Sequence, residues 1–174
     1  APRQQEAMEQ MYQAQLQFEK DSFALALSNP GGGFEGFLGI MDKYSGTAAA
    51  NLAHYYAGIS YLRLGEYEAA ISYLEDFGAG DGVTPIMKKG AIGDAHSELG
   101  NMDKAISQYK GAISAGNNEL LTPYYMKKLG LLYQKQGQND QALSTFEKLK
   151  KEYPNAPDSR DIEKYIKRLA GNAS

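Results

Sequence analysis

The sequence predicts an all-α fold built from consecutive helical hairpins, and three observations support this prediction. A pattern of small and aliphatic residues recurs along the chain, with copies that begin at Gly58, Gly93 and Gly130, spaced 35 and 37 residues apart. In each copy a second glycine follows after seven residues and an alanine after five more. Threonines suited to starting a helix precede the copies. Self-similarity at a fixed period of about 20–50 residues is the signature of repeat architectures.

The glycine and alanine positions are those expected in a pair of packed helices. The first glycine of each copy lets two helices approach closely, and the second lies just past a helix end, where a left-handed backbone costs glycine least. The alanine is expected in the contact between the paired helices. The second glycines are Gly65, Gly100 and Gly137, and the alanines are Ala70, Ala105 and Ala142.

A fourth, degenerate repeat is expected at the N-terminus. Residues 21–27 match residues 65–71 position for position, so the sequence predicts a first helix over 4–20 and a second one after it. This second helix, over 22–44, is expected to break at residues 29–33, because Pro30 disfavours helix for the residue before it and three glycines follow.

The remaining helices follow from the hairpin pattern and from local start signals. Thr47, Thr84 and Thr122 are expected to cap helices with their hydroxyls, and Pro85 and Pro123 suit the first helical position. The predicted helices cover 48–63, 67–78, 84–98, 102–115, 122–136, 140–152 and 159–170. The last one has an apolar face and a charged face, as the polar cap of a helical solenoid should. Its apolar face consists of Ile162, Tyr165, Ile166 and Leu169.

Composition excludes several classes of function. The 174 residues include no cysteine, which excludes disulfide scaffolds, thiol nucleophiles and cysteine-ligated metals. The net charge of −3 argues against wholesale coating of nucleic acid, since that binding neutralises many phosphates with Lys and Arg. No run of about 18 apolar residues is present, so no segment of this sequence is expected to span a membrane.

No catalytic, cofactor or metal site is expected. His96 occupies the repeat position of Tyr61 and Tyr133, and His54 falls on a packing position of a first helix, so both histidines are expected to pack. The glycine-rich segments 31–33 and 78–82 lack the lysine of a phosphate-binding loop and follow no strand. We therefore interpret them as connectors.

The period and the residue pattern resemble the tetratricopeptide repeat (TPR), a helix-turn-helix unit of about 34 residues. The resemblance implies a single domain over 1–174 with an α-α superhelix, the right-handed TPR solenoid. Its repeats would cover 5–46, 47–83, 84–121 and 122–157, followed by a capping helix over 158–171. The sequence departs from the family at an early aromatic position, held here by His54, Lys89 and Met126, and the closing proline is present only as Pro154.

The same resemblance implies a binding groove lined by the second, fifth, ninth and twelfth positions of each first helix. We expect a protein or peptide partner there, in contact with Tyr55, Ile59, Leu62, Asp94, Tyr124, Lys127, Leu131 and Gln134. Leu52, Met87, Gly90 and Ser97 occupy the other lining positions. The ninth positions hold Ile59, Asp94 and Leu131, so the asparagine of the family's carboxylate clamp is absent.

A broader resemblance is to bacterial TPR proteins of the cell envelope, which one N-terminal membrane helix holds with the repeats outside the cytoplasm. It rests on residues 19–23, 51–58 and 151–154. It implies a non-enzymatic adaptor near secretion or assembly machinery, on the periplasmic side of the inner membrane, with an anchor upstream of Ala1. A cytoplasmic co-chaperone or scaffold of the same fold is one alternative. A small-ligand binder or an enzyme acting in the groove is the other.

Charge is divided unevenly along the chain. Residues 1–120 carry eight Lys and Arg against fifteen Asp and Glu, whereas residues 121–174 carry ten against six. A partner in the groove would meet an acidic N-terminal part and a basic C-terminal part, which favours one orientation and raises the encounter rate.

Overall fold

The computed structural model describes residues 1–29 and 31–171, and these residues form helices and connecting turns with no strand. The chain divides into two compact units, Ala1–Gly78 and Ala79–Ser174. Unit 1 contains α1 (Pro2–Glu19), α2 (Phe23–Leu27), α3 (Phe37–Lys43), α4 (Ala48–Arg63) and α5 (Tyr67–Asp76). Unit 2 contains α6 (Thr84–Glu98), α7 (Met102–Ser114), α8 (Leu121–Lys135), α9 (Asn139–Glu152), a 3-10 turn (Pro157–Ser159) and α10 (Ile162–Gly171).

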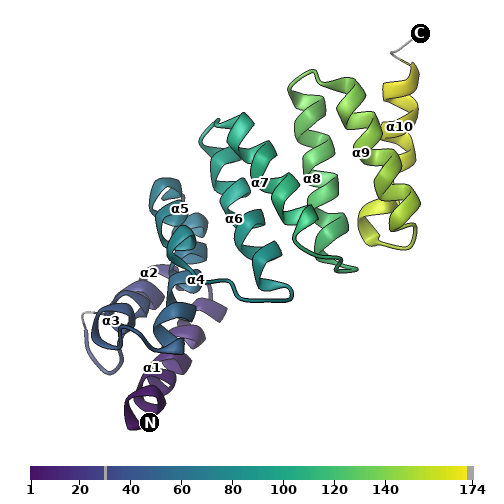
Figure 1. The fold of residues 1–174 in the computed structure, drawn as a ribbon. Helices are drawn as coiled ribbons and strands as arrows, with labels where there is room; N and C mark the ends of the chain where they lie inside the picture. The colour runs from purple at the N-terminus through teal and green to yellow at the C-terminus, as the bar shows by residue number, and fades with distance from the viewer. Residues whose placement is uncertain (30, 172–174) are drawn as a thin grey trace. The chain divides into compact units, whose positions relative to one another are not determined.

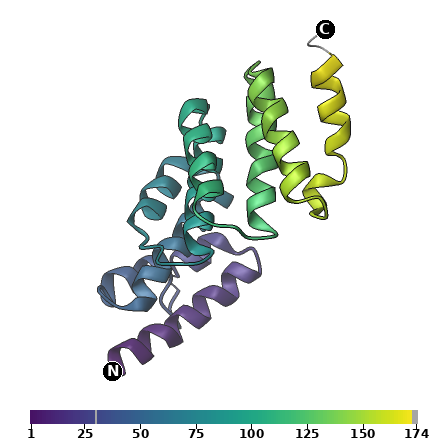
Figure 2. The same cartoon turned by 45° about the vertical axis from the view of Figure 1, so that its right-hand side comes forward.

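The predicted all-α class is confirmed for the described residues. Within unit 2, α6 to α10 stand side by side in chain order, as Figure 1 and the rotated view in Figure 2 show. Each unit has its own buried cluster. That of unit 1 includes Met11, Phe37 and Ile40, and that of unit 2 includes Tyr109, Phe146 and Leu149. The predicted division into one domain with these repeat boundaries stays a prediction.

The repeat landmarks do in the structure what their spacing predicts. A Cβ built on Gly93 would lie 2.8 Å from the ring of Tyr109, and one built on Gly58 or Gly130 would overlap Leu74 or Phe146 of the paired helix. The paired alanines, Ala70, Ala105 and Ala142, are fully buried. Only a residue without a side chain lets the two helices of each hairpin come this close.

The turn between the paired helices has the same backbone form in every hairpin. Gly65, Gly100 and Gly137 take φ values of 80°, 79° and 74°, the left-handed conformation expected for them. After α1 the same place is held by Asp21, with φ 58°, the one non-glycine residue in the described chain with a positive φ. The amide N–H of the next residue, Ser22, donates to the carbonyl of Gln17, as that of Glu66 does to Tyr61. The N-terminal hairpin is therefore built as a repeat turn with an aspartate in the glycine place.

The predicted break in the second N-terminal helix is confirmed. Helix α2 ends at Leu27, and α3 begins at Phe37, later than the sequence suggests. Gly32 and Gly33 both take positive φ values, which a helix does not allow. Pro30 lies outside the described residues.

Two of the three predicted threonine caps are wrong. The Thr47 hydroxyl accepts from the amide of Ala50 at 3.1 Å and caps α4 as expected. Thr84 and Thr122 lie inside the first turns of α6 and α8 instead. Their hydroxyls donate back to loop carbonyls, that of Thr84 to Asp81 at 2.9 Å and that of Thr122 to Gly116 at 3.1 Å.

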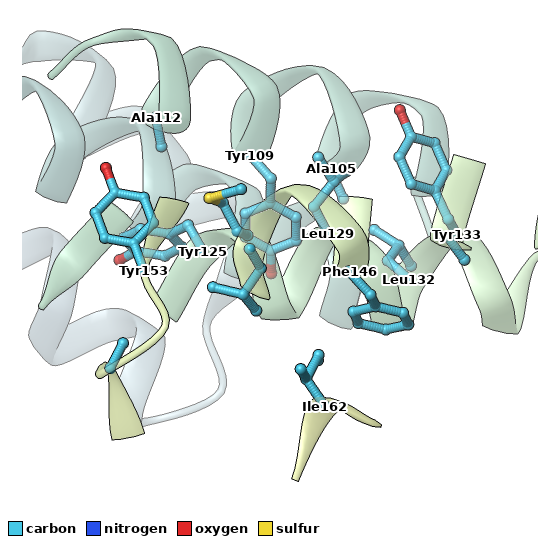
Figure 3. Close-up of a cluster of buried hydrophobic side chains, with 14 of the residues drawn as sticks. Ala105, Tyr109, Ala112, Tyr125, Leu129, Leu132, Tyr133, Phe146, Tyr153 and Ile162 are labelled. Atoms are coloured by element: carbon cyan, nitrogen blue, oxygen red, sulfur yellow. The ribbon is translucent and has the colours of Figure 1, made fainter. Parts of the chain in front are cut away.

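The C-terminal cap begins later than predicted. The chain first makes the 3-10 turn, in which the Ser159 hydroxyl donates to the carbonyl of Tyr153 at 2.7 Å, and α10 starts at Ile162 rather than at residue 159. Ile162 and Leu169 are buried in the core of unit 2. Figure 3 shows Ile162 directed toward Phe146 of α9. No helix in the described part of the chain is long and apolar enough to cross a membrane.

Candidate functional site: the α6 and α8 surface

The predicted groove residues lie on three helices, divided between the units. Tyr55, Ile59 and Leu62 lie on α4 of unit 1, and each is partly exposed. In unit 2, Asp94 lies on α6, and the other predicted residues lie on α8. Those on α8 are Tyr124, Lys127, Leu131 and Gln134.

In unit 2 the centre of the surface is a carboxylate that joins three helices. One oxygen of Asp94 accepts a hydrogen bond from the hydroxyl of Tyr109 on α7 at 2.6 Å. The same oxygen accepts from the ammonium of Lys128 on α8 at 2.8 Å. A charge-assisted hydrogen bond that is partly removed from water is stronger than a neutral one. Asp94, Tyr109 and Lys128 therefore fix the mutual placement of α6, α7 and α8.

Aromatic rings surround the Lys128 ammonium. Its Nζ lies 4.7 Å from the ring centre of Tyr124 and 6.0 Å from that of Tyr125. The two rings meet edge to face with centres 5.0 Å apart. Tyr125 also stacks on Tyr109, and Figure 3 shows these two rings side by side in the core. Lys128 is thus held by a carboxylate on one side and by π faces on the other.

The environment changes the proton affinity of two of these groups. Burial, reinforced by the charge and the hydrogen bond of Asp94, raises the pKa of the Tyr109 hydroxyl well above its ordinary value. Burial by itself would lower the pKa of Lys128, but its hydrogen bonds to Asp94 and Tyr124 more than offset that effect and raise the pKa. At neutral pH the site therefore holds a neutral Tyr109 and a charged Lys128.

The other predicted residues of α8 do not join this cluster. The Lys127 ammonium pairs with the carboxylate of Asp161, just before α10, at 3.2 Å. The hydrogen bond from Lys127 holds the pKa of the Asp161 carboxyl below its ordinary value. Leu131 and Gln134 lie one and two turns further along α8. Gly90, a predicted lining position of α6, is covered by the ring of Tyr125, which a Cβ at this position would overlap.

The corresponding surface of α4 in unit 1 is aromatic and carries no charge at the predicted positions. The Tyr55 ring contacts Phe77 with centres 5.3 Å apart and meets Tyr56 edge to face at 5.8 Å. Burial, with a smaller contribution from Tyr56, raises the pKa of Tyr55 to about 12. Tyr55 thus presents a partly covered apolar ring with a neutral hydroxyl at its tip.

Comparison with known families matches three segments of the chain. A tetratricopeptide repeat model matches residues 52–79 and 128–156, and a second tetratricopeptide repeat model matches residues 90–116. The chain contains tetratricopeptide repeats. No curated protein sequence matches it significantly. The matched TPR segments coincide with the hairpins α4–α5, α6–α7 and α8–α9, and such repeats are protein-interaction modules in general.

The sequence alone does not identify two members of the α6 and α8 surface. Tyr109 is a buried core residue, but its hydroxyl also reaches Asp94. Lys128 was not singled out, because it falls between lining positions. A signal for it exists, since Tyr124 and Lys128 are four residues apart and such pairs meet on a helix surface. The pairing with Asp94, 34 residues away, has no local signal.

The two histidines have structural partners. His54 Nδ1 lies 2.9 Å from the carbonyl of Ala50, one turn earlier in α4. His96 is buried, with its Nδ1 3.4 Å from the side-chain amide of Asn101. Among residues 1–29 and 31–171, no three His, Asp or Glu side chains lie close enough together to hold a metal ion. The α6 and α8 surface therefore offers a binding partner a fixed cation, an exposed aromatic ring and hydrogen-bonding tyrosines.

Proposed function

We propose that the chain is a non-enzymatic adaptor that binds a protein or peptide partner on the TPR surface formed by α6 and α8. One observation supports this most directly. Tyr124 is 40% exposed although it is a large aromatic residue, and its ring lies against a lysine whose position Asp94 holds. An exposed, rigid aromatic side chain loses little conformational entropy on binding, and tyrosine is enriched among the residues that dominate interfaces.

The charged part of the cluster supplies polar recognition beside this ring. An ammonium has three N–H donors, and Asp94 takes one of those of Lys128. A carbonyl or carboxylate of the partner can accept from another. Since Lys128 is held in place before binding, the partner does not have to order it, and this preorganisation favours affinity.

The test is a quantitative capture experiment with matched variants. Partners are first identified by cross-linking the full-length protein in its native cells, and then each is measured against the purified chain. Tyr124→Ala should weaken capture by about tenfold or more, the effect of losing one interface hot spot. Tyr12→Ala is the control, since Tyr12 on α1 is an even more exposed tyrosine, at 60%.

Two further variants extend the test to other residues that the sequence predicts to contact a partner. Tyr55→Ala and Lys127→Glu should weaken capture while leaving helical content and the melting temperature nearly unchanged. Lys127→Glu also removes the ion pair with Asp161, so Asp161→Asn serves as its companion, which removes the pair and leaves Lys127 charged. If Tyr124→Ala, Tyr55→Ala and Lys127→Glu all retain partners as the unaltered chain does, the binding surface lies elsewhere.

We propose further that the adaptor works in the bacterial cell envelope, near secretion or assembly machinery. Support comes from the resemblance of residues 19–23, 51–58 and 151–154 to membrane-anchored envelope TPR proteins. Fractionation of the full-length protein, together with the gene sequence upstream of Ala1, tests this location. A soluble cytoplasmic fraction and an upstream sequence without about 20 consecutive apolar residues would favour the cytoplasmic scaffold instead.

A further inference from the structure

A second candidate surface lies between α7 and α9, on the opposite side of α8 from Tyr124. Here α8 forms the floor of a hollow of about 200 Å³, lined from below by Met126, Leu129 and Tyr133. At about 100° per residue, this floor is on the face of α8 opposite to Tyr124 and Lys128. The hollow is therefore a different surface from the one proposed above.

The rim of this hollow is basic. Lys110 of α7 and Lys148 of α9 line it from the two sides. Neither lysine has an ion pair or a hydrogen bond with any residue of the described chain. In contrast, Lys127, Lys128 and Lys150 of the same unit are each paired with a carboxylate. The rim thus presents two positive charges that the protein itself does not neutralise.

The hollow continues toward the N-terminal end of α9 and changes character there. Tyr133, Ser144 and Thr145 line both the hollow and an adjoining one, which also includes Asp140 and Gln141. Asp140 brings a negative charge to that end, whereas the lysines are two turns or more further along α9 and on α7. The groove formed by the two hollows therefore has an apolar floor, a basic end and an acidic end, which gives a bound segment one preferred direction.

We propose that this α7–α9 groove binds an acidic segment of a protein partner, with carboxylates between Lys110 and Lys148 and an apolar side chain on the floor. Charge complementarity favours this occupant, because bringing another basic surface to the two free lysines would be repulsive. The apolar hollow, at about 200 Å³, has room for one side chain and is smaller than the roughly 300–1,000 Å³ of pockets that enclose drug-sized ligands.

The test uses labelled synthetic peptides and the whole chain, with binding followed by fluorescence anisotropy. The probe is a short glutamate-rich peptide with one central phenylalanine. One control peptide replaces the glutamates with lysines, and a second replaces the phenylalanine with serine. We expect the first peptide to bind, the lysine peptide not to bind, the serine peptide to bind more weakly, and added salt to weaken binding.

Variants locate the binding to the groove. The double variant Lys110→Glu and Lys148→Glu should weaken binding of the acidic peptide by about tenfold or more. Lys104→Glu with Lys151→Glu is the matched control, since these exposed lysines lie on the same two helices and outside the hollow. All four are surface residues, so both variants should keep the fold, which circular dichroism checks.

Methyl NMR supplies a measurement that needs no variant. The acidic peptide should shift the methyl signals of Ile113, Met126 and Leu129 and leave that of Leu131 on the opposite face unchanged.

The proposal is overturned if the acidic peptide does not bind, if both double variants weaken peptide binding equally, or if the Leu131 signal shifts instead. Loss of a self-associated form in the groove variant would make a second copy of this chain the occupant. Loss of peptide binding in Tyr124→Ala alone would assign the peptide to the α6 and α8 surface.

Discussion

Equivalent positions in the two units carry different chemistry on the same backbone. At the ninth position of the first helix, unit 1 has Ile59, whereas unit 2 has Asp94 on α6 and another aliphatic residue, Leu131, on α8. At the position that corresponds to Lys128, two repeats earlier, unit 1 has Tyr56. Tyr56 stacks on Phe37 with ring centres 5.3 Å apart, whereas Lys128 bonds to a carboxylate.

This difference shows which positions of a repeat determine structure and which determine function. The glycine and alanine landmarks are shared by both units and fix how the helices approach. The positions between them vary, and they make the unit 1 surface aromatic and the unit 2 surface charged. Since a repeat protein is stabilised by repeat cores and contacts between neighbours, such variation is compatible with one fold.

The largest expected effect separates the two cores. Phe37→Ala in unit 1 and Phe146→Ala in unit 2 each remove a fully buried ring, which costs about 3–5 kcal/mol of the free energy of unfolding. Because each ring belongs to the buried cluster of its own unit, protection against hydrogen exchange should fall mainly in α4 for Phe37→Ala and in α8 for Phe146→Ala. Equal loss of protection in both helices for either variant would contradict separate cores.

The next effect tests the feature that the units share. Ala70→Leu, Ala105→Leu and Ala142→Leu each force a larger side chain into a fully buried helix contact and should cost about 1–3 kcal/mol. Urea unfolding measures this cost, and Ala48→Leu at the exposed start of α4 is the control. A change below half this cost at all three sites would argue against the assigned repeat register.

Much of the fold could be predicted because its signals are local. The spacing from Gly58 to Gly65 to Ala70 specifies a close helix approach, a turn and a helix contact within thirteen residues.

The predicted caps at Thr84 and Thr122 were wrong because a hydroxyl in the first turn of a helix can instead donate to the preceding loop. The sequence does not show which partner is nearer. Only part of the cluster around Asp94 could be predicted from the sequence. Asp94 and Tyr124 were identified, but Lys128 depends on how α6 and α8 meet in space.

A third prediction tests the charged surface that unit 1 lacks. Tyr109→Phe removes the hydrogen bond to Asp94 and should cost about 1 kcal/mol near neutral pH. Burial, with Asp94, raises the pKa of Tyr109 in the folded state, so the unfolded chain ionises first as pH rises. The stabilisation is therefore fully present below about pH 10 and is lost as pH rises above it.

Urea unfolding of both proteins between about pH 8 and pH 11 measures this dependence. The stability advantage of the unaltered chain over Tyr109→Phe should shrink above about pH 10. Tyr12→Phe is the control, because the ring of Tyr12 is largely exposed. An advantage that stays constant across this range would show that Tyr109 is not a buried donor to Asp94.

The smallest effect concerns the turn that the degenerate hairpin shares with the complete repeats. Asp21 holds a left-handed conformation, with φ 58°, at the place where Gly65, Gly100 and Gly137 stand in the other turns. A side chain in this conformation is strained, although aspartate tolerates it better than most residues, and glycine is favoured there. Asp21→Gly should therefore stabilise the chain by about 0.5–1 kcal/mol, after allowing for the greater freedom of glycine in the unfolded state.

The reverse change, Gly65→Asp, should destabilise the chain by a similar amount. No atom lies within 4 Å of the added Cβ, so the backbone conformation alone decides the cost. Thermal unfolding of the two variants measures both effects, and a loss of stability in Asp21→Gly would show that the aspartate side chain contributes more to this turn than its backbone strain costs.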